Sequence, residues 1–209
     1  MDETKGHVQH EYDCLAGKYD RRWRRYVSRS IQETLRRADL RAGARVLDVG
    51  CGSGALIGEV RRKYSPTLTV GVDLSLAMVA TAKERRTAGA QFLVGDAENL
   101  PLEAAQFDVV FSTSSFHFWP NRQRALREIH RVMRPAGRLV ITDWCDDFLA
   151  RRVCDAYLRW RDPSHPRIVT RSECAALLEE CGFDVVSIER YRISWLWGLM
   201  TAIATKRRS

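Results

Sequence analysis

Three glycines, each separated from the next by one residue, follow a short apolar segment at residues 45–49. They are Gly50, Gly52 and Gly54. Glycine lets a backbone approach a ligand closely and adopt positive φ angles without strain. Asp48 lies two residues before the first glycine, where a carboxylate would repel a pyrophosphate and attract a cationic amino group. The pattern therefore favours a ligand that carries an amine and no phosphate.

The glycine spacing also separates this turn from two nucleotide-binding motifs. The dinucleotide fingerprint reads Gly-x-Gly-x-x-Gly, and a P-loop ends in Lys-Ser or Lys-Thr. Residues 50–54 read Gly-Cys-Gly-Ser-Gly, with no lysine directly after them. An NAD-dependent enzyme and a P-loop protein are both disfavoured.

Two more acids follow at spacings that suit a nucleoside. Asp73 comes about 20 residues after Gly54, where an acid at the end of a second strand can accept hydrogen bonds from a ribose diol. Asp96 can accept from an adenine amine while the backbone N–H of Ala97 meets the ring, and Met78 can lie against its face. The competing interpretation makes Asp73 a helix cap, Asp96 a turn residue and Met78 a core residue.

His117 is the candidate general base. It lies among serines and aromatic residues in the stretch 112–119, after a predicted strand. A base is needed only where the reacting group must lose a proton. The alternative is a packed loop histidine that hydrogen-bonds the backbone. The neighbouring Phe116, Phe118 and Trp119 suggest an apolar acceptor pocket or a loop anchor.

Alternating apolar patterns predict the elements that position these side chains. The expected strands are 45–49, 68–72, 90–94, 107–111 and 138–142, and the expected helices are 54–63, 75–87 and 121–133, with Ser75 as an N-cap and Pro135-Ala136-Gly137 as a helix stop. This alternation implies parallel strands joined by right-handed helical crossovers. Asp48, Asp73 and Asp96 would then lie along one crevice at the carboxyl edge of the sheet.

The C-terminal part changes character. A helix is expected at 147–161, and a second helix begins at Thr170 with Glu173 at capping-box spacing and ends at Cys181 before Gly182. Residues 183–191 and about 196–205 read as two last strands that form an antiparallel edge pair.

Residues 1–18 are polar and are predicted to start with an irregular conformation, whereas 20–38 carry an apolar stripe at helical spacing between seven arginines. Such a basic amphipathic helix can lie on a membrane surface. The other interpretation, which we favour, packs its stripe on the domain itself. Peripheral membrane contact through 20–38 stays open as an alternative.

Length and composition suit one globular domain over 1–209, with an N-terminal helical cap at 1–42, a ligand-binding core at 43–145 and an acceptor-side part at 146–209. The six cysteines are scattered without a Cys-x-x-Cys pair, which indicates reduced thiols, a cytoplasmic protein and no metal site. The start lacks a signal-peptide pattern, and the longest apolar run, near 193–204, is too short to span a membrane. The net charge of +8 permits an anionic partner but also fits solvated arginine-rich faces.

A series of motifs in consistent order over about residues 11–143 resembles the class I S-adenosylmethionine-dependent methyltransferases. The motifs are Val46-Leu47-Asp48-Val49-Gly50-Cys51-Gly52-Ser53-Gly54, Gly71-Val72-Asp73, Gly95-Asp96-Ala97-Glu98-Asn99-Leu100-Pro101, Phe107-Asp108-Val109-Val110 and the run from Leu126 to Leu139. The similarity is to the small-molecule branch that includes the ubiquinone/menaquinone C-methyltransferases (methyltransferase type 11). One departure is Ala136, where the family usually has glycine; because a small residue is kept, little consequence is expected.

This resemblance implies an α/β fold, a Rossmann-like doubly wound sheet of seven mostly parallel strands with the antiparallel pair at the C-terminus. It implies S-adenosyl-L-methionine as cofactor and S-adenosyl-L-homocysteine as product, with Asp48 and Gly50 at the methionine end, Asp73 at the ribose, and Asp96 and Ala97 at the adenine. The remaining expected cofactor contacts are Cys51, Gly52, Leu74, Met78, Ser112 and Tyr19. Tyr19 belongs to an N-terminal segment that resembles one folding over the cofactor, and it is a second catalytic candidate beside His117.

The expected reaction is methyl transfer to a small, lipophilic acceptor such as a quinone or a lipid. A nucleic-acid methyltransferase is the rival enzyme, disfavoured because no Asn-Pro-Pro-Tyr-like motif follows the strand at 107–111. A non-catalytic module that binds S-adenosylmethionine is the rival from another class. The sequence leaves open the acceptor atom, the oligomeric state and any role for the cysteines.

Overall fold

The computed structural model describes residues 3–145, 168–194 and 197–207. Its strands are β1 (Arg45–Val49), β2 (Leu68–Asp73), β3 (Ala90–Val94), β4 (Phe107–Thr113), β5 (Met133–Trp144), β6 (Phe183–Arg192) and β7 (Gly198–Lys206). Its helices are α1 (Glu3–Ala38), α2 (Ala55–Tyr64), α3 (Leu76–Glu84), the short 3-10 helix η1 (Phe116–Phe118), α4 (Arg122–Val132) and α6 (Arg171–Glu180).

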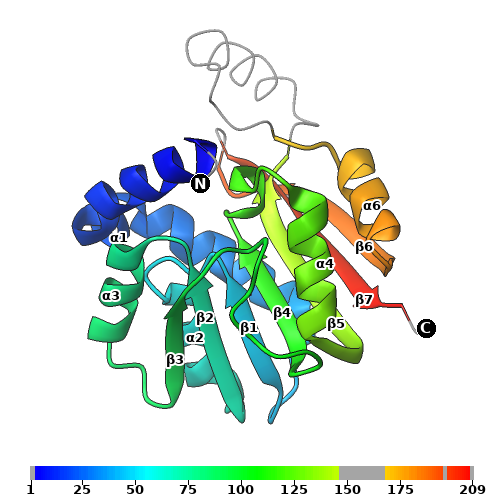
Figure 1. Cartoon of the computed structure of the whole chain (residues 1–209), viewed down its shortest axis with the longest axis horizontal. Helices are drawn as coiled ribbons and strands as arrows, with labels where there is room; N and C mark the ends of the chain where they lie inside the picture. The colour runs from blue at the N-terminus through cyan, green and yellow to red at the C-terminus, as the bar shows by residue number, and fades with distance from the viewer. Residues whose placement is uncertain (1–2, 146–167, 195–196, 208–209) are drawn as a thin grey trace, which may run out of the picture.

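The strands form one twisted sheet in the order β3-β2-β1-β4-β5-β7-β6 (Figure 1). Strands β1 to β5 are parallel, and β7 runs antiparallel to both β5 and β6. The chain moves outward from β1 to β3 and then crosses back to β4 on the other side of β1. This reversal opens a crevice at the carboxyl ends of β1 and β4, where ligands of open α/β sheets bind. The predicted fold class is confirmed.

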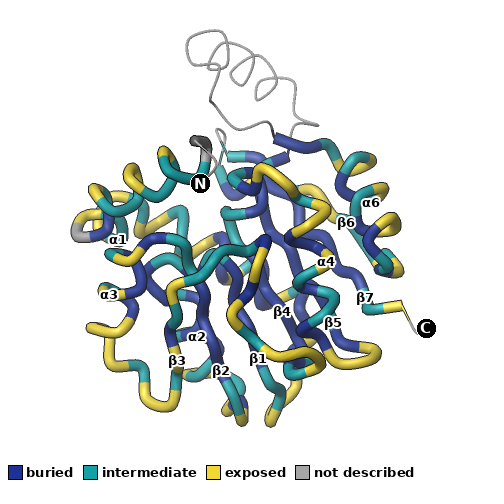
Figure 2. The backbone as a smooth tube through the Cα atoms, viewed as in Figure 1, coloured by how far each residue is buried: buried dark blue, intermediate teal, exposed yellow. Residues whose placement is uncertain are grey.

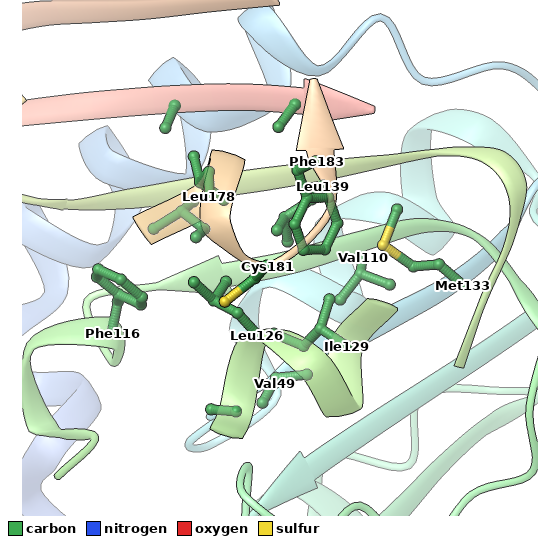
Figure 3. Packing of buried hydrophobic residues seen from close by; sticks show 14 of the residues in the cluster. Val49, Val110, Phe116, Leu126, Ile129, Met133, Leu139, Leu178, Cys181 and Phe183 are labelled. Carbon is green, nitrogen blue, oxygen red and sulfur yellow. The ribbon is translucent and has the colours of Figure 1, made fainter. Parts of the chain in front are cut away.

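Two apolar cores cover the two faces of the sheet. One joins the sheet to α4 and α6 through residues such as Leu126, Ile129 and Leu178 (Figure 3). The other joins it to α1, α2 and α3 and includes Ile31 and Ile57. The central strands are buried on both faces, whereas the loops at their amino ends are exposed (Figure 2).

The N-terminus departs from the prediction. Residues 1–18 were expected to start with an irregular conformation, but α1 is a single helix of 36 residues that begins at Glu3. Its C-terminal half carries the predicted stripe, with Ile31, Leu35 and Ala38 buried in the second core. Its N-terminal half covers the crevice. No helix in the described ranges is both long and apolar enough to cross a membrane.

Most other boundaries agree with the sequence pattern. The hydroxyl of Ser75 accepts a hydrogen bond from the N–H of Met78 at 3.0 Å, and Thr170 and Glu173 form the predicted capping box. The predicted strands at 183–191 and 196–205 correspond to β6 and β7. The helix expected at 147–161 lies outside the described residues.

Pro135-Ala136-Gly137, predicted as a helix stop, instead lie in a bulge within β5. Helix α4 already ends at Val132, and β5 begins at Met133. Phe107 pairs with Met133 and Val109 with Arg138, so 134–137 form a bulge inside β5. Ala136 adopts a φ of 58° there. The alanine at this position therefore has a backbone conformation that favours glycine.

Candidate functional site

The glycine turn after β1 approaches the sheet closely. The N–H groups of Gly50 and Cys51 both donate to the carbonyl of Val72, at 2.8 Å and 3.1 Å. Gly50 and Gly52 have φ angles of 74° and 49°. A Cβ on Gly50 would lie 1.9 Å from the Oγ of Ser115, so this position accepts no side chain. The turn thereby presents bare backbone to the crevice.

Asp48 is the most unusual group of the site. Its side chain is 2% exposed, and its Oδ1 atom has no hydrogen-bond partner in the part of the chain that the structure describes. Burial, together with the nearby carboxylate of Asp73, raises the pKa of Asp48 to about 8. A buried carboxylate without a partner is costly. A cationic amino group beside Oδ1 would supply the missing donor and favour the charged form, so Asp48 fits an ammonium.

Asp73 is held by the backbone. Its Oδ2 accepts from the N–H of Gly52 at 2.7 Å, and its Oδ1 accepts from the N–H of Ser75 at 2.9 Å. Burial raises the pKa of Asp73, and these hydrogen bonds partly oppose the shift. Each carboxylate oxygen keeps further acceptor capacity, which a vicinal diol can use.

Asp96 has a partner that the sequence analysis did not foresee. The ammonium of Lys5 lies 2.7 Å from an oxygen of Asp96 and 2.7 Å from an oxygen of Glu98. Burial opposes the charge on Lys5, but the hydrogen bonds with both carboxylates outweigh it and raise the Lys5 pKa. Lys5 lies in the segment predicted to be irregular, where no local pattern linked it to a residue 91 positions away.

The predicted residues meet at one cavity at the carboxyl ends of β1, β2 and β4. Ten of them line it: Tyr19, Asp48, Gly50, Cys51, Gly52, Asp73, Leu74, Met78, Asp96 and Ala97. The other two, Ser112 and His117, are not among its lining residues. Ser112 is buried, and its hydroxyl has no hydrogen-bond partner within the described ranges.

Helix α1 roofs the cavity with tyrosines. Tyr12, Tyr19 and Tyr26 are spaced by seven residues, about two helical turns, and all three line the cavity. The Tyr12 ring lies 5.9 Å from that of Tyr19 and 5.4 Å from that of Phe118. Burial raises the pKa of Tyr19 to about 12, so its hydroxyl is protonated at neutral pH. Tyr26 lies within the predicted stripe at 20–38 and was not among the predicted cofactor contacts.

Three polar residues of α1 fasten this roof to three strand ends. Asp20 accepts from the hydroxyl of Ser53 in the turn after β1, at 2.6 Å. Asp13 accepts from Ser75 and from the N–H of Ala77 after β2. Lys5 makes the contacts after β3. Each successive contact therefore reaches the loop after the next strand.

His117 lies behind the cavity wall. It belongs to η1, and its Nδ1 is 2.7 Å from Oδ1 of Asp143 at the end of β5. Its ring stacks on Trp144, with centroids 4.4 Å apart, and lies 4.0 Å from the ring of Phe118, which does line the cavity. No local sequence pattern predicted the contact with Asp143, because the two residues are 26 positions apart.

The described residues contain no group of three or more His, Cys, Asp or Glu side chains that could hold a metal ion. Cys14, Cys51, Cys174 and Cys181 are free thiols in this part of the chain. Burial raises the pKa of the Cys51 and Cys174 thiols, that of Cys174 to about 12. These two thiols are therefore poor nucleophiles at neutral pH.

Comparison with known proteins agrees with this geometry. Residues 47–141 match a protein-family model described as "Methyltransferase domain". A phthiotriol/phenolphthiotriol dimycocerosates methyltransferase from Mycobacterium ulcerans (strain Agy99) is 41% identical over 49% of this chain and 38% of its own length. Demethylmenaquinone methyltransferase from Thermotoga maritima is 33% identical over 68% of this chain and 63% of its own length. The chain thus covers less than two thirds of either relative.

A solved structure shares nearly the whole fold. It is a chain from the complex between the Haloferax volcanii Trm112 methyltransferase activator and a methyltransferase. The TM-score is 0.83 over 95% of this chain and 98% of that chain, at 19% sequence identity. At this identity the likeness concerns the fold alone.

Proposed function

We propose that this chain is a class I S-adenosylmethionine-dependent methyltransferase that transfers a methyl group to a small, lipophilic acceptor. One observation carries the proposal: a buried carboxylate oxygen without a partner, on Asp48, borders the cavity that Asp73 and Asp96 also line. An amine, a ribose and an adenine together provide a donor for each of these acids.

We assign the cofactor contacts by chemistry. Asp48 and Gly50 hold the amino-acid end, Asp73 accepts from the ribose hydroxyls, and Asp96 with the N–H of Ala97 binds the adenine. Met78 lies under the base. S-adenosylmethionine would supply a methyl group bound to a sulfonium sulfur. The acceptor attacks the methyl carbon in line with the sulfur, which leaves. The protein positions the two reactants and excludes water, which can supply much of the rate.

The acceptor class is supported by two independent features. The relatives named above are, by name, methyltransferases of a phthiotriol lipid and of demethylmenaquinone. The rings of Tyr12, Tyr19, Tyr26 and Phe118 line the cavity, and such a wall suits an apolar or aromatic acceptor.

The cofactor assignment is tested by calorimetric titration with S-adenosylhomocysteine, with NADH as the alternative ligand. We expect micromolar binding of S-adenosylhomocysteine only, weakened at least tenfold in Asp73→Ala, or about 1.4 kcal/mol. The exposed Asp184, which pairs with Arg207 on the β6 edge, provides the control Asp184→Ala. Absence of binding, or binding that is insensitive to Asp73, contradicts the proposal.

We also propose peripheral contact between α1 and an anionic membrane, because a lipophilic acceptor partitions into lipid. A groove between α1 and α2 is lined by Arg21, Arg24, Arg62, Lys63 and Arg85, against the acids Asp20 and Glu59. Arg21 and Arg24 are exposed and form no ion pair within the described ranges. Each basic side chain near an anionic surface contributes about 1 kcal/mol of attraction.

Sedimentation with phosphatidylglycerol and phosphatidylcholine vesicles at low and high salt tests this contact. We expect binding to the anionic vesicles alone, loss of binding at high salt, and weaker binding by Arg21→Ala/Arg24→Ala than by the control Arg127→Ala/Arg134→Ala on the α4–β5 side. Equal binding by the two double variants rules out the α1 surface. A cytoplasmic location rests on the scattered cysteines, which form no Cys-x-x-Cys pair, and stays a prediction.

A further inference from the structure

The contact between His117 and Asp143 determines where the imidazole proton lies. Nδ1 of His117 is 2.7 Å from Oδ1 of Asp143, and the backbone N–H of His117 donates to Oδ2 at 3.0 Å. The N–H of Trp144 also donates to Oδ1, at 2.6 Å. A carboxylate that receives three donors acts as an acceptor throughout, so Nδ1 carries the hydrogen. In the neutral ring, Nε2 is then left with a lone pair.

That lone pair has no donor. Nε2 is buried and has no hydrogen-bond partner in the ranges that the structure describes, and His117 is 3% exposed. A buried acceptor without a partner costs free energy, and packed loop histidines usually satisfy both nitrogens. His117 therefore has one nitrogen fixed by a carboxylate and the other free to accept a proton.

The pair lies next to the cavity. Phe118, whose ring is 4.0 Å from that of His117, belongs to the cavity wall. The Trp144 ring stacks on the His117 ring. Its Nε1–H donates to the hydroxyl of Tyr26 at 2.8 Å, and Tyr26 also lines the cavity. Phe118 and Tyr26 thus connect the stacked His117 and Trp144 rings to the cavity that we expect to hold the cofactor and the acceptor. Access from the cavity to Nε2 would require the Phe118 side chain to rotate.

We propose that Asp143 and His117 form a general-base pair, and that the acceptor belongs to the class that gives up a proton: a hydroxyl, or the ring carbon of a hydroquinone. This inference rests on the proposed methyl transfer. Thioethers and tertiary amines, which need no base, are excluded as acceptors. His117 is the base, and Asp143 is a positioning residue that fixes its tautomer.

The step balances in atoms and charge. The O–H or C–H bond of the acceptor breaks, and its proton passes to Nε2. The new bond joins the acceptor atom to the methyl carbon, and the electron pair of the broken sulfur–carbon bond stays on sulfur. The sulfonium charge disappears while His117 becomes an imidazolium beside Asp143, which stabilises it.

Nitrogen NMR of the histidine ring is the first test, and it requires no acceptor. The His117 signals are identified by their loss in His117→Asn. We expect Nδ1–H with an unprotonated Nε2 at pH 8 in the wild type, and the opposite tautomer or a mixture in Asp143→Asn, because an amide can donate to Nδ1. A wild-type ring that carries its proton on Nε2 overturns the inference.

Methyl transfer is the second test. The probes are demethylmenaquinol, an alkylphenol and N,N-dimethyldodecylamine, together with a total lipid extract. We expect turnover of proton-bearing acceptors only. In His117→Asn and Asp143→Asn, kcat should fall at least 100-fold while the Kd of S-adenosylhomocysteine changes less than threefold. The exposed His7 provides the control His7→Asn.

The outcomes separate this inference from the proposed function. Wild-type protein that fails to bind S-adenosylhomocysteine contradicts the methyltransferase proposal itself, and the ring NMR still decides whether the base pair exists. Binding and turnover that persist in His117→Asn, or efficient methylation of the tertiary amine, overturn the base pair alone. A kcat that rises with pH in the wild type, but not in His117→Asn, supports it.

Discussion

The ionised carboxylate of Asp48 has opposite effects on stability and on ligand binding: its burial lowers the stability of the folded chain, and its charge favours the ammonium of the ligand. Burial raises its pKa to about 8 in the folded chain, whereas an unfolded aspartate titrates near 3.9, roughly its ordinary value. The stability linked to this group is full below about pH 4 and is lost as the pH rises toward 8, because the folded state then has to release a proton that it holds more tightly. The difference between the two pKa values corresponds to on the order of 5 kcal/mol.

Replacing Asp48 with Asn removes this titration at nearly constant size. Between pH 5 and pH 8 we expect the unfolding free energy of the wild type to fall relative to that of Asp48→Asn by about 4 kcal/mol. The variant should be the more stable protein at pH 8. It should nevertheless bind S-adenosylhomocysteine at least tenfold more weakly, because an amide does not neutralise the ligand's ammonium.

Urea denaturation at pH 5, 6, 7 and 8 measures the first effect, with the exposed Asp184→Asn as the control. Calorimetry at pH 7 in two buffers of different ionisation enthalpy measures how many protons are released when S-adenosylhomocysteine binds. An Asp48 that is mostly protonated before binding should release about 0.9 proton when the ammonium arrives, and the variant should release none. Parallel stability curves for the wild type and Asp48→Asn would refute the reasoning.

Two further substitutions test the backbone. Gly50→Ala should destabilise the chain by about 3 kcal/mol, because its Cβ would collide with Ser115 at a φ of 74°. In thermal unfolding, Gly50→Ala should lose more stability than Gly43→Ala, because Gly43 also has a positive φ but has open space around it. Equal losses of stability would show that the collision with Ser115 is relieved. Ala136→Gly should stabilise the bulge of β5 by about 0.5–1 kcal/mol, since Ala136 has a φ of 58°, and any loss of stability in urea denaturation would contradict the strain.

The parallel part of the fold follows from local sequence patterns. Each of β1 to β3 is a short apolar run bounded by glycine, proline or a capping residue, and helix periodicity fills the intervals between β1 and β2 and between β2 and β3. Strand ends that share one sheet edge bring together side chains far apart in sequence, so Asp48, Asp73 and Asp96 could be placed at one crevice without the structure.

The N-terminal half of α1 could not be predicted in this way. Its inner face meets the cavity rather than the core, so it presents tyrosines and polar residues where a packed helix would show an apolar stripe. Its stabilising contacts, made by Lys5, Asp13 and Asp20, all go to loops at distant positions. Tertiary contacts of this kind determine the conformation where no local sequence pattern predicts it.

The pairing of His117 with Asp143 was hidden for a related reason. His117 follows β4 and Asp143 lies near the end of β5, and only the parallel pairing of these strands brings the two residues together. The left-handed φ of Ala136 was also hidden, because the size of a residue does not reveal it. Both features depend on backbone geometry that a list of residue types does not contain.

Helix α1 spans the sheet from edge to edge. Its first turns hold the loop after β3, and near its end Arg37 pairs with Glu189 of β6 at 2.9 Å. These are the two edge strands, and the helix is about 54 Å long at 1.5 Å per residue. Helix α1 therefore completes its docking only after β6 has been made, because Glu189 follows Arg37 by 152 positions. Substitutions that disrupt β6 should loosen the helix that carries the cavity's tyrosines. The structure of the cavity therefore depends on the folding of the sheet from one edge to the other.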